Sequence, residues 1–564
     1  MKASRGYGIQ RCNGRTMVIQ RTFPARLWPT HLFILAVAIA VLFAPLGKRA
    51  WGQDIVGHVV LLLEQNENLA REIRNSRDVL GTYYLEEKGK LLWVGTGRMP
   101  QLLDSMRNAE REGLFSSDYP TDYLQQLLDA APQADAKSQA VVELLYSAFF
   151  LKFANDIKAG RVLPKKVDPE LYWQTKEVDQ AQAMRLLASS PGMQQFITDW
   201  EPALPAYKIL KARLATYREL AQSRSWPKFP PGETLKPGMD DPRVPVLRER
   251  LAGEGPEGAM AAAEQGTVYK GRIVEAMKRF QEEHGLEPDG VIGFKTIVAL
   301  NITLEERVRQ IVVSMERWRW IPEDLGRDYL LVNIAGFHLT RFENGRFAER
   351  KRVIVGKTYH RTPAFSNEIK YLEFNPYWNV PYSIATREML PKLQKSSGAL
   401  SSSFEVLSGD RVINPRSVDW RQYSRSSFPF SVRQKPGPKN ALGQVKFMFP
   451  NRFNVYLHDT PDRSLFDKTF RSFSHGCVRV HEPIDLAGAV LRRNEGWDRA
   501  RIDGVLASGE RTVVNLDTPL PVHIVYSTAW VAEDGSVRFY VDFYQRDEKL
   551  YQALFGKPVP WKGG

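Results

Sequence analysis

The spacing of apolar residues changes along the chain, and this change most limits the folds available to it. Residues from about Asp54 to Ala221 follow helical spacing, whereas strand-like runs begin at Tyr329 and are separated by Asn-Gly and Pro-containing turns. A Pro-rich segment, Ser225 to Pro242, lies between the two patterns and indicates a domain boundary. The sequence therefore predicts a multidomain α+β protein with a helical amino-terminal part and a mainly β carboxy-terminal part.

The length and composition suit several globular domains. At roughly 150 residues per domain, the 564 residues predict three or four domains. A hydrophobic share of 43% and a charged share of 25% are typical of a globular protein rather than a disordered or membrane-embedded one. The net charge of +14 is typical of a solvated surface and also suits an anionic partner. The sequence has no nucleic-acid-binding motif, so nucleic acid is not an expected partner.

The amino terminus resembles an export signal. A stretch rich in lysine and arginine and free of acidic residues precedes an apolar run, Leu32 to Gly47. The run is short for a spanning helix, which needs about 20 apolar residues, but extending it back to Leu27 gives a length close to that of an anchor. Residues 1–53 are therefore predicted to be a signal peptide or a membrane anchor. A buried amino-terminal helix is the alternative, and it would leave the basic flank without a role.

Export affects the interpretation of the two cysteines, Cys12 and Cys477. Cys12 lies in the predicted signal region, so Cys477 has no intramolecular partner for a disulfide. In an oxidising compartment a leftover thiol is either buried and inert or chemically reactive. The stretch SFSHGCVRVHEP around Cys477 favours a reactive thiol.

Residues 236–303 have the pattern of a compact helical unit. Two apolar stripes at helical spacing are followed by a turn at Asp289-Gly290 and a third short helix around Lys295 to Leu300. The segment FQEEHGLEPDGVIGFKTIVALN resembles the three-helix peptidoglycan-binding module that is attached to many cell-wall enzymes. A small bundle that serves as a spacer is the alternative interpretation.

A long polar insertion interrupts the strand pattern after Pro381. Residues 383–439 contain SSGALSSS and SVRQKPGPK, with a helix predicted around Ala385 to Lys395. Insertions of this length inside a compact domain are usually lids or disordered segments. Strands resume afterwards, so we expect a mainly β domain that carries an insertion.

The residues around Cys477 include the groups that acyl transfer by a thiol requires: a thiolate, a base and donors for the oxyanion. A strand, a loop and a return strand would bring the imidazole of His458 beside the sulfur, where it would lower the thiol pKa and later protonate the leaving amine. Gly476 would let a substrate carbonyl approach the backbone, so that the N–H of Cys477 and of a neighbour form an oxyanion hole. The backbone carbonyl of Asp459 would hold the second ring nitrogen of His458.

His475 competes with His458 for the role of base, because alternate residues of an extended segment point to one face and His475 is two residues from Cys477. Arg479 has two interpretations: it holds a substrate carboxylate, or it braces the loop. We expect Arg479, His475 and Tyr456 to contact the substrate. The sequence contains no metal-ligand cluster, so no metal or other cofactor is predicted.

YLHDTP followed by SHGCVRV resembles the signature of the L,D-transpeptidases with a YkuD-type catalytic domain. NPYWNVP, KFMFPN and TAWVAEDGSVRFYVDFY resemble the larger Gram-negative members of that family. The resemblance implies that Cys477 is the nucleophile, His458 the general acid and base, and Asp459 a residue that contributes its backbone carbonyl. Gly476 and Arg479 correspond to the family's motif glycine and arginine.

The family accepts serine at the position of His475, which argues against His475 as an obligatory base. The resemblance also implies a domain order. We expect a helical scaffold at 54–222, a peptidoglycan-binding-like domain at 236–303, and a catalytic domain at 325–564 whose insertion, about 383–439, is a substrate-capping lid.

The resemblance further implies a function in peptidoglycan biosynthesis, and hence in cell-wall organisation and cell shape. Such enzymes release the terminal D-alanine of a tetrapeptide stem and form a 3→3 cross-link between diaminopimelate residues. The acceptor is another stem, a lipoprotein lysine or a free amino acid, with water in competition. The expected partners are stem peptides and carbapenem inhibitors, and the expected location is the periplasm.

Three other functions compete with this one. A sortase-like transpeptidase also uses cysteine, histidine and arginine, but its arginine usually lies on a separate strand. Papain-like wall peptidases place cysteine before histidine, the opposite of the order of His458 and Cys477. A non-catalytic wall-binding protein would not need the histidine, glycine and cysteine together.

Overall fold

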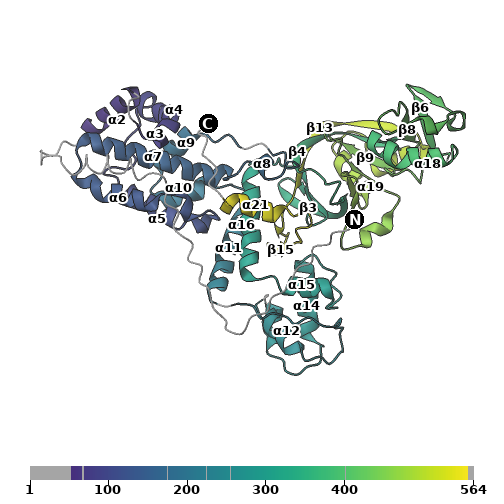
Figure 1. The fold of residues 1–564 in the computed structure, drawn as a ribbon, viewed down its shortest axis with the longest axis horizontal. Helices are drawn as coiled ribbons and strands as arrows, with labels where there is room; N and C mark the ends of the chain where they lie inside the picture. The colour runs from purple at the N-terminus through teal and green to yellow at the C-terminus, as the bar shows by residue number, and fades with distance from the viewer. Residues whose placement is uncertain are drawn as a thin grey trace, which may run out of the picture.

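The computed structural model describes residues 53–65, 69–173, 176–223, 225–253, 256–400 and 402–556. The predicted signal peptide or anchor, residues 1–53, lies outside these residues except for its last one. A helical region occupies one end of the molecule and a β domain the other, with a small helical module to one side (Figure 1). Among the described residues, none of the helices combines the length and the apolar character that crossing a membrane requires.

The helical region packs around one central helix, α7, which is buried on nearly all sides as its apolar sequence predicts. The side chain of Asp135 caps α7 by accepting a hydrogen bond from the backbone N–H of Ser138. Inside the core, the buried carboxylate of Glu143 accepts hydrogen bonds from the Tyr84 hydroxyl and the Leu92 N–H. The helices of this region are α2 (Gln53–Gln65), α3 (Arg71–Asn75), α4 (Arg77–Gly81), α5 (Arg98–Arg107), α6 (Thr121–Ala130), α7 (Ala136–Ala159), α8 (Pro164–Val167), α9 (Gln180–Ser189), α10 (Met193–Trp200) and α11 (Pro205–Ser223).

Helix α11 packs with the β domain rather than with α7. It lies against α16 (Leu304–Trp320), and its buried side chains share the hydrophobic core of the sheet. Helix α16, which falls outside every predicted domain, lies between α11 and α21 (Arg546–Gly556) (Figure 1). It buries Arg319 completely, and this guanidinium donates to the carbonyl of Ile157 at the end of α7. Helix α16 therefore connects the helical region to the β domain.

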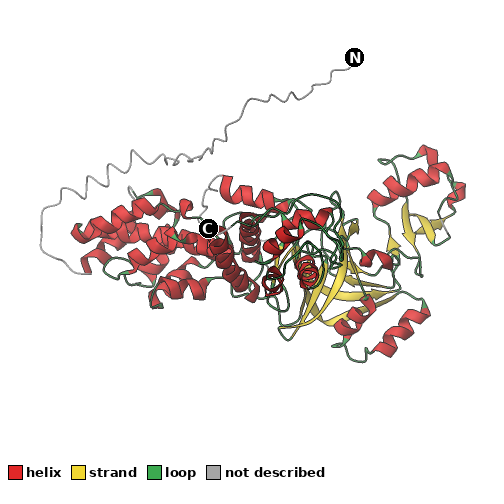
Figure 2. Ribbon diagram, turned by 90° about the horizontal axis from the view of Figure 1, so that it is seen from below, coloured by secondary structure: helices red, strands yellow, loops and turns green. Residues whose placement is uncertain are grey.

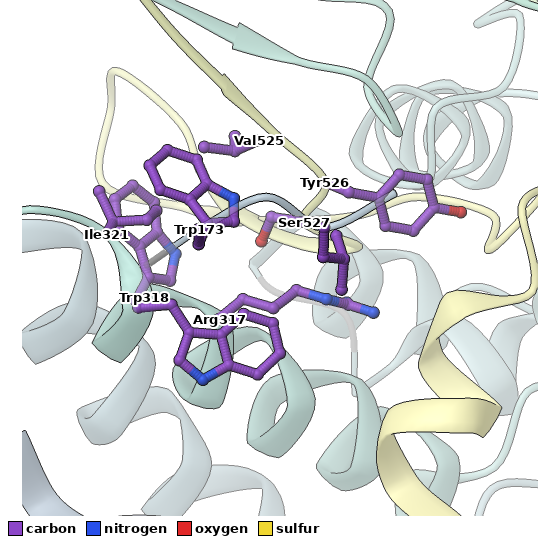
Figure 3. Close-up of a pocket in the computed structure, with 9 residues that line it drawn as sticks. Trp173, Arg317, Trp318, Ile321, Val525, Tyr526 and Ser527 are labelled. Carbon is purple, nitrogen blue, oxygen red and sulfur yellow. The ribbon is translucent and has the colours of Figure 1, made fainter. Parts of the chain in front are cut away.

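Side chains nearly fill the junction between the helical region and the β domain. The hollow that remains has a volume of about 10 Å³, room for about one water molecule. Trp173 reaches it from the helical region, Trp318 from α16, and Tyr526 from the end of the β domain's longest strand (Figure 3). Packing of this density favours a fixed arrangement of the helical region against the β domain.

The module has four helices in its described part, one more than predicted. The additional short helix, α13, follows the first helix, and the expected turn is present with Gly290 at a φ of +75°. The module contacts the β domain through His284, which is stacked between Phe280 of the module and Phe539 of the β domain. Its helices are α12 (Val244–Leu251), α13 (Pro256–Ala262), α14 (Arg272–Glu283) and α15 (Phe294–Leu300).

The β domain is built on a nine-stranded sheet in the order β11-β3-β12-β10-β9-β4-β13-β1-β2. The additional pairing of β2 with β3 closes the sheet on itself and places its core inside. The strands are β1 (Tyr329–Asn333), β2 (His338–Glu343), β3 (Arg346–Gly356), β4 (Phe365–Phe374), β9 (Val445–Met448), β10 (Leu457–His458), β11 (Ser472–Ser474), β12 (Val478–Val480) and β13 (Thr512–Val525). A separate hairpin, β14 (Ala529–Val531) and β15 (Val537–Phe539), and helices α19 (Pro483–Leu491) and α20 (Arg499–Ser508) complete the domain.

The insertion is a folded unit, which we call the cap and define as residues 376–440. It has a hydrophobic core of its own, which includes Leu393, Trp420 and Val432, and it lies beyond the end of the main sheet (Figure 2). The side chain of Asn440 donates to the carbonyl of Pro376, so the two connections to the sheet are tied together. The cap contains β5 (Trp378–Asn379), α17 (Tyr382–Ile384), a π-helix (Ala385–Met389), α18 (Leu390–Lys395), β6 (Phe404–Ser408), β7 (Arg411–Ile413) and β8 (Ser431–Gln434).

Candidate active site

Strand pairing brings the two predicted reactive segments together. Strands β10 and β12 are parallel neighbours, with His458 opposite Arg479, and the Val478 N–H donates to the Tyr456 carbonyl at 3.2 Å. Cys477 directly precedes β12 and therefore lies level with Tyr456. The chain between the two strands leaves the sheet and returns through β11, which pairs with β3.

His458 is buried and held in one tautomer. Its Nδ1 lies 2.5 Å from the backbone carbonyl oxygen of Asp459, and because a carbonyl can only accept, Nδ1 carries the hydrogen. Nε2 is then the acceptor. Burial, with the positive charge of Arg479, lowers the pKa of His458 to about 3. The imidazole is therefore neutral at physiological pH and suited to accept a proton.

His458 contacts the backbone carbonyl of Asp459 and not its carboxylate, which has other hydrogen-bond partners. One carboxylate oxygen accepts from the Thr460 N–H at 2.6 Å and the other from the Gln444 N–H at 2.9 Å. The guanidinium of Arg463 lies 2.8 Å from the same carboxylate. These contacts hold the loop that follows His458 in place.

Cys477 is a free, partly exposed cysteine. Its Sγ lies 3.6 Å from the Asn454 carbonyl oxygen. Burial raises the pKa of the thiol, and hydrogen bonding from Tyr456 and the charge of Lys446 offset part of that rise. That the imidazole lowers the thiol pKa stays a prediction. His458 is neutral in the resting structure and becomes positively charged only when it accepts a proton.

Gly476 has a backbone conformation that an L side chain rarely adopts, with a φ of +118°. Its N–H donates to Ser474 Oγ at 3.1 Å, so the resting structure already uses this donor. Ser474 Oγ in turn donates to the Cys477 carbonyl at 2.5 Å. The N–H of Cys477 has no acceptor among the described residues and is available to a substrate oxyanion.

Tyr456 lies beside both reactive groups. Its ring is edge-on to that of His458, with ring centres 5.6 Å apart. Burial, followed by the proximity of Cys477, raises the pKa of the Tyr456 hydroxyl. Lys446 Nζ lies 5.0 Å from the centre of the tyrosine ring and 3.2 Å from a carboxylate oxygen of Glu373. Lys446 was not among the residues predicted from the sequence.

The other two predicted substrate-binding residues have structural partners. Arg479 lies 3.5 Å from the carboxylate of Asp462 and 3.4 Å from the hydroxyl of Thr460, contacts that favour its role in bracing the loop after His458. His475 is exposed, and its Nε2 lies 3.1 Å from a carboxylate oxygen of Glu388 in the cap.

Three family models match the chain. Residues 78–214 match a "Scaffold domain", residues 240–300 a "Putative peptidoglycan binding domain", and residues 327–516 an "L,D-transpeptidase catalytic domain". The chain contains an L,D-transpeptidase catalytic domain. The family resemblance and the multidomain α+β fold class predicted from the sequence are thereby confirmed, and the domain indicates an enzyme.

Two individual proteins are also similar. A "Putative L,D-transpeptidase" of Haemophilus influenzae is 33% identical over 247 residues, which are 43% of this chain and 49% of that protein. The match thus spans about half the length of that relative. A crystal structure of the L,D-transpeptidase (residues 123–326) from Xylanimonas cellulosilytica aligns at 15% identity over 52% of this chain and 99% of its own, with a TM-score of 0.17, too low to support any conclusion.

Sequence reasoning missed several residues that surround the catalytic-domain site. Ser474 is part of the SFSHGC motif, and its position three residues before Cys477 was a signal that could have identified it. Thr362 and Tyr544 stand far from the motif in the sequence, and nothing local to them points to the thiol. Lys446 begins the string KFMFPN, but that string gives no sign of its closeness to Tyr456. All three residues come to the site through the pairing of strands and the packing of the carboxy-terminal segment.

Proposed function

We propose that this protein is a peptidoglycan L,D-transpeptidase that forms 3→3 diaminopimelate cross-links through a thioester on Cys477. One observation carries the proposal: the strand that ends in a neutral, oriented His458 is hydrogen-bonded to the strand that begins after Cys477. This pairing lies inside the part of the chain that matches the L,D-transpeptidase catalytic domain.

In the proposed acylation, the sulfur of Cys477 attacks the carbonyl at the L-centre of diaminopimelate in a tetrapeptide stem. His458 Nε2 takes the thiol proton as the carbon–sulfur bond forms. The oxyanion accepts a hydrogen bond from the Cys477 N–H. His458 then gives its proton to the amine of D-alanine as the carbon–nitrogen bond breaks, which leaves a thioester.

In the proposed second half, the side-chain amine of another stem's diaminopimelate attacks the thioester. His458 removes a proton from this amine, the carbon–sulfur bond breaks, and the proton returns to the sulfur. Water that attacks in place of the amine gives a hydrolysed stem. Because thiol and imidazole both begin neutral, the reaction needs proton transfer during attack rather than a resting ion pair.

The remaining roles are proposals of the same kind. Tyr456 lines the donor site beside the sulfur, Arg479 positions the loop that carries Thr460, and His475 contacts substrate at the edge of the cap. The cap is a lid over the bound stem. Its exposed lysines and arginines favour capture of an anionic substrate.

We propose the domain limits 54–222, 236–303 and 325–564, and a periplasmic location with the first 53 residues as signal or anchor. The match to a peptidoglycan-binding model supports an interaction of the 236–303 module with the cell wall. A cell-wall enzyme with such a module works outside the cytoplasm, which supports the proposed location.

Incubation of the purified protein with disaccharide-tetrapeptide tests the function. We expect release of D-alanine and a cross-linked product that fragments between two diaminopimelate residues in mass spectrometry. Treatment with a carbapenem should add its mass to the peptide that contains Cys477. Absence of both the product and the adduct would overturn the proposal in favour of a non-catalytic wall-binding protein.

A further inference from the structure

Thr362, a buried residue outside the signature motifs, hydrogen-bonds to the peptide that carries the thiol. Its hydroxyl donates to the Gly476 carbonyl oxygen at 2.9 Å and accepts from the Gly356 N–H at 2.9 Å. The residue is completely buried. Thr362 therefore links the end of β3 to the loop that precedes Cys477.

Tyr544 holds Thr362 in this position. Its hydroxyl accepts from the Thr362 N–H at 3.0 Å and donates to the Gly356 carbonyl at 2.5 Å. Tyr544 is also completely buried, and its ring stacks on that of Tyr526. The two hydroxyls and the N–H and carbonyl groups of Gly356 form a network in which each polar group has a partner, and such buried networks are rigid.

A segment of the helical region hydrogen-bonds to Ala364, two residues after Thr362. The Ala364 N–H donates to the Glu170 carbonyl at 3.1 Å, and the Ala364 carbonyl accepts from the Tyr172 N–H at 2.9 Å. Asp168, completely buried, lies 3.1 Å from Arg546, two residues after Tyr544. Thr362 is thus in direct contact with Gly356, Gly476 and Tyr544, and the segment that follows it is held by the helical region.

The position of the Gly476 carbonyl determines where the Cys477 N–H points. The two groups belong to one planar peptide unit, and in a trans unit they point in opposite directions. Because Thr362 holds the carbonyl oxygen inside the protein, the N–H of Cys477 is directed away from it. Gly476, at a φ of +118°, permits rotations of this peptide that other residues would resist, so an external contact has to set its orientation.

We propose that Thr362, supported by Tyr544, is a positioning residue that orients the Gly476–Cys477 peptide so that the Cys477 N–H serves as the oxyanion donor. The role rests on the proposed function of Cys477 as an acyl-accepting nucleophile. It acts through the peptide and not through contact with the substrate.

The test compares acylation with alkylation of the same sulfur in the full-length protein. Acylation by p-nitrophenyl acetate develops an oxyanion, whereas alkylation by iodoacetamide does not. Thr362→Val keeps the shape of the side chain but removes the hydroxyl. We expect it to lower the acylation rate of Cys477 about 10²-fold, the range seen when an oxyanion donor is lost, and to leave the alkylation rate within about twofold.

Matched variants separate positioning from general destabilisation. Thr362→Ser should restore acylation, because it returns the hydroxyl. Thr340→Val is the control, since Thr340 is also buried, in β2, and its hydroxyl has no partner among the described residues. Tyr544→Phe should lower acylation in the same selective way, and it replaces Thr362→Val if that variant melts at a much lower temperature.

Equal loss of acylation and alkylation in Thr362→Val, or no loss of either, would overturn the proposal. Failure of Thr362→Ser to restore acylation would do so as well. The acylation rates are measured with a simple ester, so they test the role of Thr362 even if the wild-type protein makes no peptidoglycan cross-link. A wild type that acylates selectively but does not cross-link would contradict the proposed function alone.

Discussion

The loop that carries Cys477 is held on two sides, and the two sides differ in kind. On the side of the sheet, buried hydroxyls of Thr362 and Ser474 hydrogen-bond to the peptides on either side of the thiol. On the side of the cap, His475 meets Glu388 at 3.1 Å, and their side chains are 36% and 51% exposed.

The difference in burial between these two sets of contacts determines which of them fixes the position of the thiol. Removing one partner from a buried hydrogen bond leaves a polar group without water and costs about 1–3 kcal/mol. A contact between two exposed polar side chains contributes about 0–1 kcal/mol. The cap has its own hydrophobic core, so its fold does not depend on its contact with the loop that carries Cys477. We infer that the sheet orients the nucleophile, whereas the cap controls access to it.

The largest effect should come from the thiol itself. Cys477→Ser should abolish cross-linking while the protein stays folded, because a hydroxyl is a far weaker acid than a thiol and His458 cannot activate it comparably. Product formation from disaccharide-tetrapeptide and the melting temperature are the measurements. Substantial activity in a folded variant would contradict the assignment of the nucleophile.

Substitution of His458, on the side of the sheet, and of His475, on the side of the cap, compares the two sides directly. His458→Ala should lower the acylation rate by about 10² to 10⁴-fold, the usual contribution of general acid–base catalysis. His475→Ser should cost far less, since its contact is with the cap. Rates of carbapenem acylation in the two variants give the comparison, and the reverse order of effects would make His475 the base.

Removal of the cap should separate selectivity from the integrity of the sheet. Pro376 and Asn440 are joined by a hydrogen bond of 3.0 Å, so a short Gly/Ser linker can replace residues 377–439 without straining the sheet. We expect Cys477 to remain alkylatable, cross-linking to fall, and hydrolysis to gain relative to transfer, because a lid excludes water from the thioester. An unchanged ratio of cross-linked to hydrolysed product would mean that the cap is not a lid.

Lowering the pH should destabilise the β domain, which contains the buried histidines His338 and His458. Burial lowers the pKa of both His338 and His458 to about 3, below the ordinary value of 6.5. The unfolded chain then binds more protons than the folded one, so stability is lost as the pH falls below 6.5. We expect about 1 kcal/mol of unfolding free energy to be lost per histidine between pH 6.5 and 5.5. Urea unfolding at the two pH values measures it, and equal stabilities would contradict the burial of these neutral rings.

The smallest effect should come from the contact with the cap. Glu388→Gln removes the charge but keeps the size of the side chain, and an exposed pair of this kind contributes less than about 1 kcal/mol. The melting temperature should stay unchanged within error, and the acylation rate should change by less than about threefold. A loss as large as that of Thr362→Val would mean that both sides orient the thiol.

The sequence alone predicted that a helical part precedes a mainly β part. It also predicted the family of the β domain and the candidate reactive pair, His458 and Cys477. These features are encoded locally. A long segment that is apolar on most faces predicts the central helix α7, and the strings HDTP and HGCVR carry His458 and Cys477 with their neighbours. The insertion was recognised as well, because polar, Ser- and Pro-rich composition breaks a strand pattern.

The tertiary structure alone decided how those residues are held and in which protonation state they begin. The pKa of His458 is low, and that of Cys477 is raised, because of desolvation, which depends on everything that packs around a group and not on its neighbours in the chain. Thr362 and Tyr544 reach Gly476 across long sequence separations, and no local pattern marks such partners. The connecting role of helix α16 and the folded core of the cap could likewise be recognised only in the tertiary structure. Both depend on surfaces that are buried against segments distant in the sequence.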